Sequence, residues 1–108
     1  MQQLADTLIR TLNAFDVDGA LALFAPDAVI DDVSVGDIFV GAERIRRYFE
    51  QFFVGYQTAS KLLSLTQLDE AAAIVRLDFT GDFGHEIGFL RINRSADGLI
   101  ERIEADLE

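Results

Sequence analysis

The sequence predicts an α+β domain, in which helices from the first half of the chain pack on one face of a curved antiparallel sheet and close a cone. Apolar residues recur at helical spacing through much of the first 53 residues, whereas apolar and polar residues alternate over most of residues 56–107. Helices that precede a run of antiparallel strands are typical of the α+β class.

Length and composition predict a single domain, residues 1–108, because a second core would leave neither part large enough to fold well. Half of the residues are hydrophobic, and the aromatic residues are nine phenylalanines and two tyrosines. This composition predicts a bulky, dry interior and no disordered segment.

The charge and cysteine content exclude several classes of function. A formal net charge of −10 argues against nucleic acids and anionic membranes as partners, because both would repel the chain. The absence of cysteine excludes disulfides and thiolate chemistry, and it fits a cytoplasmic location. Residues 1–12 lack the features of a signal peptide, and no apolar run approaches the ~20 residues that span a bilayer.

Two helices are expected before residue 26. Leu4, Leu8 and Leu12 recur at helical spacing and predict an amphipathic helix over about residues 3–14. Asp16 is the expected N-cap of a second helix. We expect Pro26 to end that helix, because proline lacks a backbone donor and restricts the residue before it.

Residues 28–33 suit a short strand. Alternation puts Asp31 and Asp32 on opposite faces, but both faces carry apolar residues, so the pattern does not decide which aspartate points inward. A loop through Gly36 and an extended piece at residues 37–40 follow. The third helix starts after Gly41, and its expected inward residues are Ile45, Tyr48, Phe49, Phe52 and Phe53.

The second half of the chain predicts a meander of strands joined by short turns. In the clearest of them, Val75, Leu77 and Phe79 share one face, which we expect to be the concave one. The strands are expected at residues 56–68, 72–80, 85–94 and 99–107.

Three features point to a known family: the stretch LNAFDVDGALALFAPDAVIDD, the glycine at position 41 followed by AERIRRYF, and the closing antiparallel strands. Together they resemble the nuclear transport factor 2-like superfamily, especially its SnoaL-like and ketosteroid-isomerase-like branches, over nearly the whole chain. The resemblance implies a cone-shaped curved sheet with a mixed edge, packed with three helices from the N-terminal half. It also implies a homodimer through the outer face of the sheet. It says less about activity, because one fold hosts many functions.

The resemblance assigns a position to a catalytic base. Ketosteroid isomerases carry a proton-shuttling aspartate just after the first strand, and the spacing to the helix-starting glycine places Asp32 there. The two oxyanion-hole donors of that branch do not carry over. The tyrosine position on the first helix is Leu8, and the protonated-aspartate position on the penultimate strand is Gly88.

A second branch, the limonene-epoxide-hydrolase-like enzymes, uses an Asp-Arg-Asp constellation to activate water. Arg76 and Asp78 have the matching Arg-x-Asp spacing, but alternation puts them on the face opposite Leu77. The position of the other aspartate, on the last strand, is Ala105. The sequence therefore gives this comparison little support.

Asp32 and Glu86 are the candidate catalytic residues. A carboxylate at the mouth of an apolar cone loses hydration, which disfavours its charged form and suits a general base. Glu86 shares its parity with Gly88 and Leu90, so it is expected to point inward as a second acid or a hydrogen-bond partner. The alternatives are an Asp32 that bonds loop amides as an Asx turn and a Glu86 that reaches solvent.

The expected pocket takes a small apolar or partly polar ligand. Neither a cofactor nor a metal is expected, because the single histidine, His85, has outward parity and no acidic spacing resembles a calcium loop. The predicted ligand-binding residues are Leu8, Ile30, Phe49, Phe52, Tyr56, Leu77, Phe79, Gly88 and Leu90.

Three hypotheses follow from these residues. The first is an isomerase or cyclase that uses Asp32 as a proton-transfer base on a small carbonyl compound. The second, favoured by the missing oxyanion donors, is a non-catalytic domain that binds a small ligand or dimerises. The third is a structural dimer whose cone is filled by its own phenylalanines. Ile87 and Phe89 on the outer face predict an apolar patch that a homodimer would bury.

Overall fold

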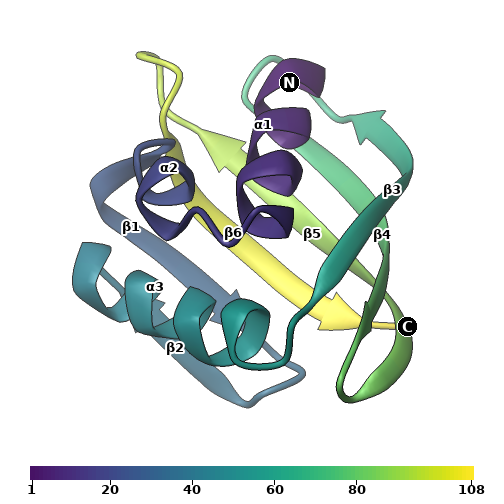
Figure 1. Cartoon of the computed structure of the whole chain (residues 1–108). Coiled ribbons are helices and arrows are strands. Elements are labelled where there is room, and N and C mark those ends of the chain that lie inside the picture. Colours follow the sequence, from purple (N-terminus) through teal and green to yellow (C-terminus); the bar gives the residue numbers. More distant parts are fainter.

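A computed structural model describes all 108 residues and shows helices packed against a single six-stranded sheet (Figure 1). The helical elements are α1 (Gln2–Asn13), α2 (Val17–Leu21), α3 (Ala42–Phe49) and the π-helical turn η1 (Glu50–Val54). The strands are β1 (Phe24–Asp32), β2 (Asp37–Val40), β3 (Ala59–Gln67), β4 (Ala72–Gly81), β5 (Gly84–Arg94) and β6 (Ile100–Leu107).

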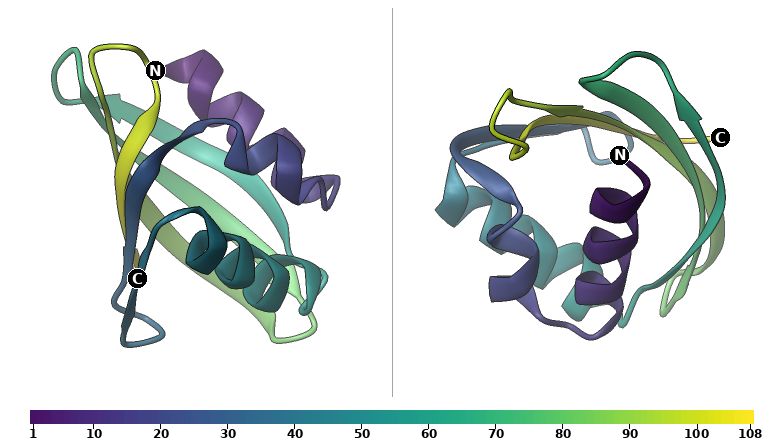
Figure 2. Two further views of the ribbon diagram at one scale, coloured as in Figure 1. Left: turned by 90° about the vertical axis from the view of Figure 1, so that its left-hand side faces the viewer. Right: turned by 90° about the horizontal axis from the view of Figure 1, so that it is seen from above.

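The sheet has the strand order β2-β1-β6-β5-β4-β3. Strands β1 and β6 pair in parallel, and every other neighbouring pair is antiparallel. The sheet curls around α1, which lies in its hollow, and is not closed (Figure 2). This architecture confirms the predicted α+β class and the curved sheet with a mixed edge.

The second helix is shorter than the sequence predicts. Its N-cap is Asp16, whose side chain accepts a hydrogen bond from the Gly19 amide at 2.9 Å. The helix ends at Leu21, so the expectation that Pro26 ends it was wrong. Pro26 instead lies within β1, where the pairing with β6 shifts register between Phe24 and Val29. A proline is tolerated there because no regular ladder bond requires its missing N–H.

The core forms where the concave face of the sheet meets the helices. Val75 and Leu77 of β4 are buried, whereas Arg76 between them is exposed, as the alternation predicts. On α1, Ala5, Leu8 and Leu12 supply the buried stripe. None of the helices is long and apolar enough to cross a membrane.

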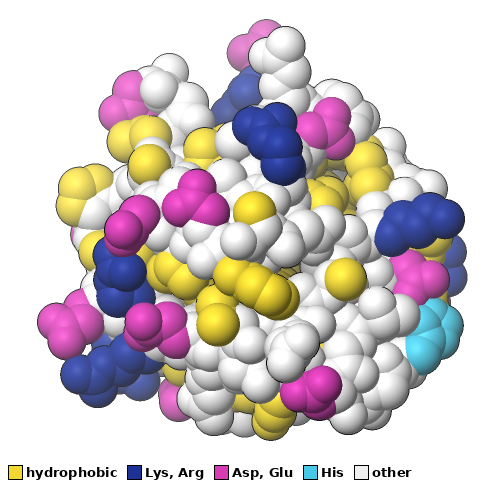
Figure 3. All heavy atoms as spheres, viewed as in Figure 1, with side chains coloured by type: hydrophobic (Ala, Val, Ile, Leu, Met, Phe, Trp, Pro, Cys, Tyr) yellow, Lys and Arg dark blue, Asp and Glu magenta, His cyan; other side chains and the backbone are white.

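The segment from α3 through η1 carries the main aromatic cluster. Tyr48, Phe49 and Phe53 are buried, and their rings contact one another with centroid separations of 5.8–6.0 Å. Because these rings are buried, the aromatic side of α3–η1 faces the interior of the cone, as the sequence predicts. The outer surface on the helix-covered side shows charged side chains of both signs around a band of hydrophobic atoms (Figure 3).

Candidate functional site

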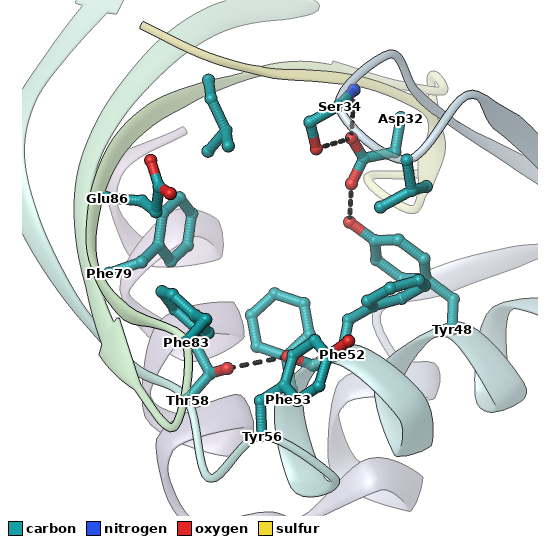
Figure 4. A pocket seen from close by; sticks show the side chains of 12 residues that line it. Asp32, Ser34, Tyr48, Phe52, Phe53, Tyr56, Thr58, Phe79, Phe83 and Glu86 are labelled. Carbon is teal, nitrogen blue, oxygen red and sulfur yellow. Dashed lines mark hydrogen bonds between the residues drawn. The ribbon is translucent and has the colours of Figure 1, made fainter.

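A cavity of about 260 Å³ lies where the end of β1, the α3–η1 segment and the β4–β5 hairpin meet (Figure 4). Most of its lining is apolar or aromatic, and two carboxylates are included. The lining residues are Asp32, Ser34, Val35, Tyr48, Phe52, Phe53, Tyr56, Thr58, Phe79, Phe83, Glu86 and Leu107. The phenylalanines of the chain therefore fill only part of the interior.

The two adjacent aspartates at the end of β1 have different surroundings. Asp32 lines the cavity and is only 6% exposed. Asp31 points to the outer face, where a carboxylate oxygen lies 3.4 Å from the Arg102 guanidinium. Because successive side chains of a strand point to opposite faces, the structure decides between the two residues and places Asp32 in the pocket.

Three neutral donors hold the Asp32 carboxylate. The Tyr48 hydroxyl donates to Oδ2 at 2.5 Å, and the Ser34 hydroxyl and amide donate to Oδ1 at 2.5 and 3.0 Å. The bond to the amide two residues on is an Asx turn, so Asp32 both terminates its strand and faces the cavity. None of the ion pairs in the structure includes Asp32.

Tyr48 remains protonated beside this carboxylate. Burial, the negative charge of Asp32 and the hydrogen bond to Asp32 together raise the pKa of the Tyr48 phenol well above 10. The tyrosine side chain is only 5% exposed and is packed against Phe39 and Phe52. Tyr48 therefore acts as a fixed hydrogen-bond donor, and it fixes the orientation of the Asp32 carboxylate.

The opposite wall of the cavity carries Glu86 and aromatic rings. Glu86 lies on β5 directly across from Phe79 of β4, and its side chain is drawn toward the cavity in Figure 4. Unlike Asp32, it is an exposed residue. Tyr56 and Phe83 pack edge to face at 5.9 Å and continue the aromatic lining.

The predicted site residues divide into two groups. Asp32, Glu86, Phe52, Tyr56 and Phe79 all line the cavity. The other predicted ligand-binding residues do not line it, because α1 fills the hollow of the sheet where most of them lie. Those residues are Leu8, Ile30, Phe49 and Leu77, which are core side chains, Leu90, which packs against the core, and the buried Gly88.

Gly88 shows why one family donor cannot be accommodated here. A Cβ at this position would lie 2.7 Å from the Asp106 carbonyl oxygen and 3.1 Å from the Phe79 ring. The backbone of β6 is too close for a side chain. At the other donor position, Leu8 is packed in the core. The protein therefore lacks both hydrogen-bond donors that the resemblance to ketosteroid isomerases would require.

Several lining residues were not among the predicted site residues. Ser34 could have been found as the Asx-turn partner two residues after Asp32, and Leu107 shares its parity with the buried Ile103 and Ala105. Phe83 lies in a turn, where no periodicity indicates direction. Val35 and Thr58 were not predicted to line the pocket, and Tyr48 and Phe53 were expected only as inward-facing residues of the third helix.

The residues of the epoxide-hydrolase comparison lie outside the cavity. The Arg76 guanidinium bonds Glu108 at 2.5 Å, and Asp78 Oδ1 lies 2.6 Å from His85 Nε2. Neither Arg76 nor Asp78 lines the pocket. No group of three or more histidine, aspartate or glutamate side chains is arranged to hold a metal ion.

Comparisons with known proteins agree with this geometry. Residues 5–103 match the SnoaL-like domain family. The structure of SMa1630 from Sinorhizobium meliloti, a candidate polyketide cyclase, is 23% identical, with a TM-score of 0.85 over 95% of this chain and 93% of that one. A candidate ketosteroid isomerase from Kribbella flavida is 20% identical, with a TM-score of 0.86 over 98% of this chain and 76% of that one.

A third similar structure contains a steroid. Rv0760c from Mycobacterium tuberculosis, in complex with estradiol-17beta-hemisuccinate, is 19% identical, with a TM-score of 0.85 over 96% of this chain and 90% of that one. No curated protein matches the chain by sequence. At these identities the similar structures show the fold alone, whereas the family match covers most of the sequence. The chain therefore belongs to the SnoaL-like domain family, within the nuclear transport factor 2-like fold.

Proposed function

We propose that the protein binds a small carbonyl compound in its cavity and that Asp32 transfers a proton on it, as in an isomerase or cyclase. The supporting observation is a buried carboxylate that faces an apolar cavity and is held in one orientation by Tyr48 and Ser34. A base must lie within hydrogen-bond reach of the proton that it removes, and fixed orientation lowers the entropic cost of that geometry.

The proposed reaction begins at the carbon next to the carbonyl group. Asp32 takes the proton from that carbon, and the electron pair moves onto the carbonyl oxygen to form an enolate. In an isomerisation, Asp32 returns the proton to another carbon of the conjugated enolate. In a cyclisation, the enolate carbon bonds to a second carbonyl carbon, and Asp32 gives its proton to the alkoxide oxygen that forms. Because Leu8 and Gly88 offer no polar side chain at the two donor positions, we propose that the Tyr56 hydroxyl of the lining donates a hydrogen bond to the enolate oxygen.

The experiment is hydrogen–deuterium exchange into small cyclic ketones and β-diketones, followed by NMR in D₂O. We expect Asp32→Asn to slow enzyme-dependent exchange by about 10²–10⁴-fold, the range of general-base catalysis. Asp31→Asn is the matched control, because it removes the neighbouring carboxylate that points outward. Equal exchange by wild type and Asp32→Asn, with folding retained, would contradict the proposal.

A second candidate is a non-catalytic domain that holds a small ligand. The crowding at Gly88 and the burial of Leu8 favour it, because an enolate oxygen would find neither family donor. This candidate predicts ligand-dependent stabilisation without exchange, and ligand affinity that changes little in Asp32→Asn. Thermal unfolding with and without ligand, measured on both proteins, separates it from the first.

We also propose a homodimer through the outer face of the sheet. Ile87 and Phe89 lie on that face and are only half-buried in the single chain. A second copy would remove their apolar surface from water. Sedimentation velocity on wild type and Phe89→Glu tests this proposal, and an unchanged monomer in both would contradict it.

A further inference from the structure

We infer that the ligand of this cavity is a compact organic cation, a molecule that carries a protonated or quaternary amine. The inference rests on the proposed function, since it names the ligand class of the same site. Three properties of the lining carry it: its charge, its aromatic rings and its size.

The charge of the lining is entirely negative. Asp32 and Glu86 are its only ionisable side chains other than the two tyrosines, and it contains no lysine, arginine or histidine. Asp32 is buried, and its three hydrogen-bond donors are neutral. Buried charges in proteins are usually paired with a charge of opposite sign. A cationic ligand would supply the counter-charge that the protein itself does not.

The aromatic rings of the lining suit the same ligand. Cations are attracted to the faces of aromatic rings, most strongly where water is excluded. The rings are held by edge-to-face contacts with one another, as between Phe52 and Tyr56 at 6.0 Å and between Phe53 and Phe79 at 6.4 Å. These rings are Tyr48, Phe52, Phe53, Tyr56, Phe79 and Phe83, and in Figure 4 they line the side of the cavity that is formed by α3, η1 and the β4–β5 hairpin.

The size of the cavity and the net charge of the protein narrow the class of ligand further. A volume of about 260 Å³ lies below the ~300–1,000 Å³ typical of pockets for drug-sized ligands, so the ligand is compact. The net charge of −10 raises the local concentration of cations and lowers that of anions near the protein. Phosphorylated, sulfated and carboxylate-bearing compounds are therefore disfavoured, and a ligand that combines a carbonyl group with an ammonium group fits both proposals.

The test compares three probes of similar shape and different charge: choline, 3,3-dimethylbutan-1-ol and 3,3-dimethylbutanoate. Affinities are measured by NMR chemical-shift titration of the protein at neutral pH and constant ionic strength. We expect choline to bind at least about tenfold more tightly than the alcohol, because cation–π contacts add to the attraction of the two carboxylates, and the carboxylate probe to bind most weakly. Choline that binds no more tightly than the alcohol, or that shows no shifts at all, overturns the inference.

Two variants show whether the pocket itself selects the cation. We expect Glu86→Gln to weaken choline several-fold and to leave the affinity for the alcohol unchanged. Glu101→Gln makes the same change of net charge at an exposed residue of β6 outside the lining, so choline should bind it as it binds wild type. Equal weakening in both variants would show an effect of overall charge and would overturn the inference.

This experiment is independent of the test for proton transfer. Loss of charge selectivity contradicts the cationic ligand but leaves exchange into neutral ketones by Asp32 intact. Absence of exchange contradicts the proton-transfer role but leaves the preference for choline intact. The two proposals can therefore fail separately.

Discussion

The space enclosed by the curved sheet has two parts with opposite properties. Around α1 it is filled by apolar side chains such as Leu8, Ile92 and Ile100, all nearly or fully buried. Beyond the end of β1 it is a cavity that contains a buried carboxylate, a buried phenol and an exposed glutamate. The comparison indicates that the filled part of the interior stabilises the fold, whereas the cavity leaves space and polar groups for a ligand.

The largest expected effect on stability lies in the filled part. Leu8→Ala should lower the free energy of unfolding by about 2–5 kcal/mol, because it removes buried methyl groups and leaves a cavity. Urea denaturation measures this loss, and Leu4→Ala, a half-buried residue of the same helix, should cost less. Ligand affinity should stay unchanged in the folded Leu8→Ala protein. A large loss of affinity would show that the two parts are coupled.

Tyr48→Phe acts on the polar part. It removes the hydrogen bond to a buried carboxylate and should lower the free energy of unfolding by about 1.5–3 kcal/mol. Tyr56→Phe is the control, because that side chain is partly exposed and its hydroxyl does not bond Asp32. If the two variants lose the same stability, the Tyr48–Asp32 bond does not stabilise the protein.

Gly88→Ala tests the crowding beside the cavity. The new Cβ would approach the Asp106 carbonyl oxygen at 2.7 Å, and neither strand can move without disturbing the sheet. We expect a loss of about 1–3 kcal/mol, the usual cost of overpacking. Thermal unfolding measures it. A variant as stable as wild type would show that β5 and β6 can separate enough to admit a side chain, and with it a donor.

The smallest expected effect is a dependence of stability on alkaline pH. Folding raises the pKa of Tyr48 above its ordinary value of 10.0, so the folded protein keeps a proton that the unfolded chain releases. The stabilisation is complete below about pH 10 and is lost as the pH rises further. Urea denaturation between about pH 9 and pH 11 should therefore show a steeper decline for wild type and Tyr56→Phe than for Tyr48→Phe. Equal slopes in all three would contradict the assignment.

The sequence predicts most of the fold because its signals are local and repeated. The alternation in β4 indicates the inward face correctly, and the spacing on α1 and α3 indicates the buried stripes. The role of Pro26 was predicted wrongly because proline has two common uses. It ends helices, but it is also tolerated at an irregular position of a strand, which is where Pro26 lies. The parallel pairing of β1 with β6 joins distant parts of the chain, and no local pattern encodes it.

The site is only partly predictable, because it also depends on contacts between distant parts of the chain. Parity finds Glu86 and Phe79, but it does not say how far α1 extends into the hollow. Parity therefore predicts Leu77 as a ligand-binding residue, although it forms core; Leu8, expected there from the family's tyrosine position, forms core as well. The Tyr48–Asp32 bond depends on how α3 lies against the end of β1, which is a property of tertiary packing.

The position of β6 has a consequence for how the protein forms. This last strand lies between β1 and β5, so the β1–β2 hairpin joins the rest of the sheet through it alone. Contacts between residues far apart in the chain form slowly, because a long loop must close first. During synthesis on the ribosome, Asp32 cannot face Glu86 across a finished cavity until β6 has emerged. We therefore expect ligand binding to appear late in refolding, after most of the helical structure has formed.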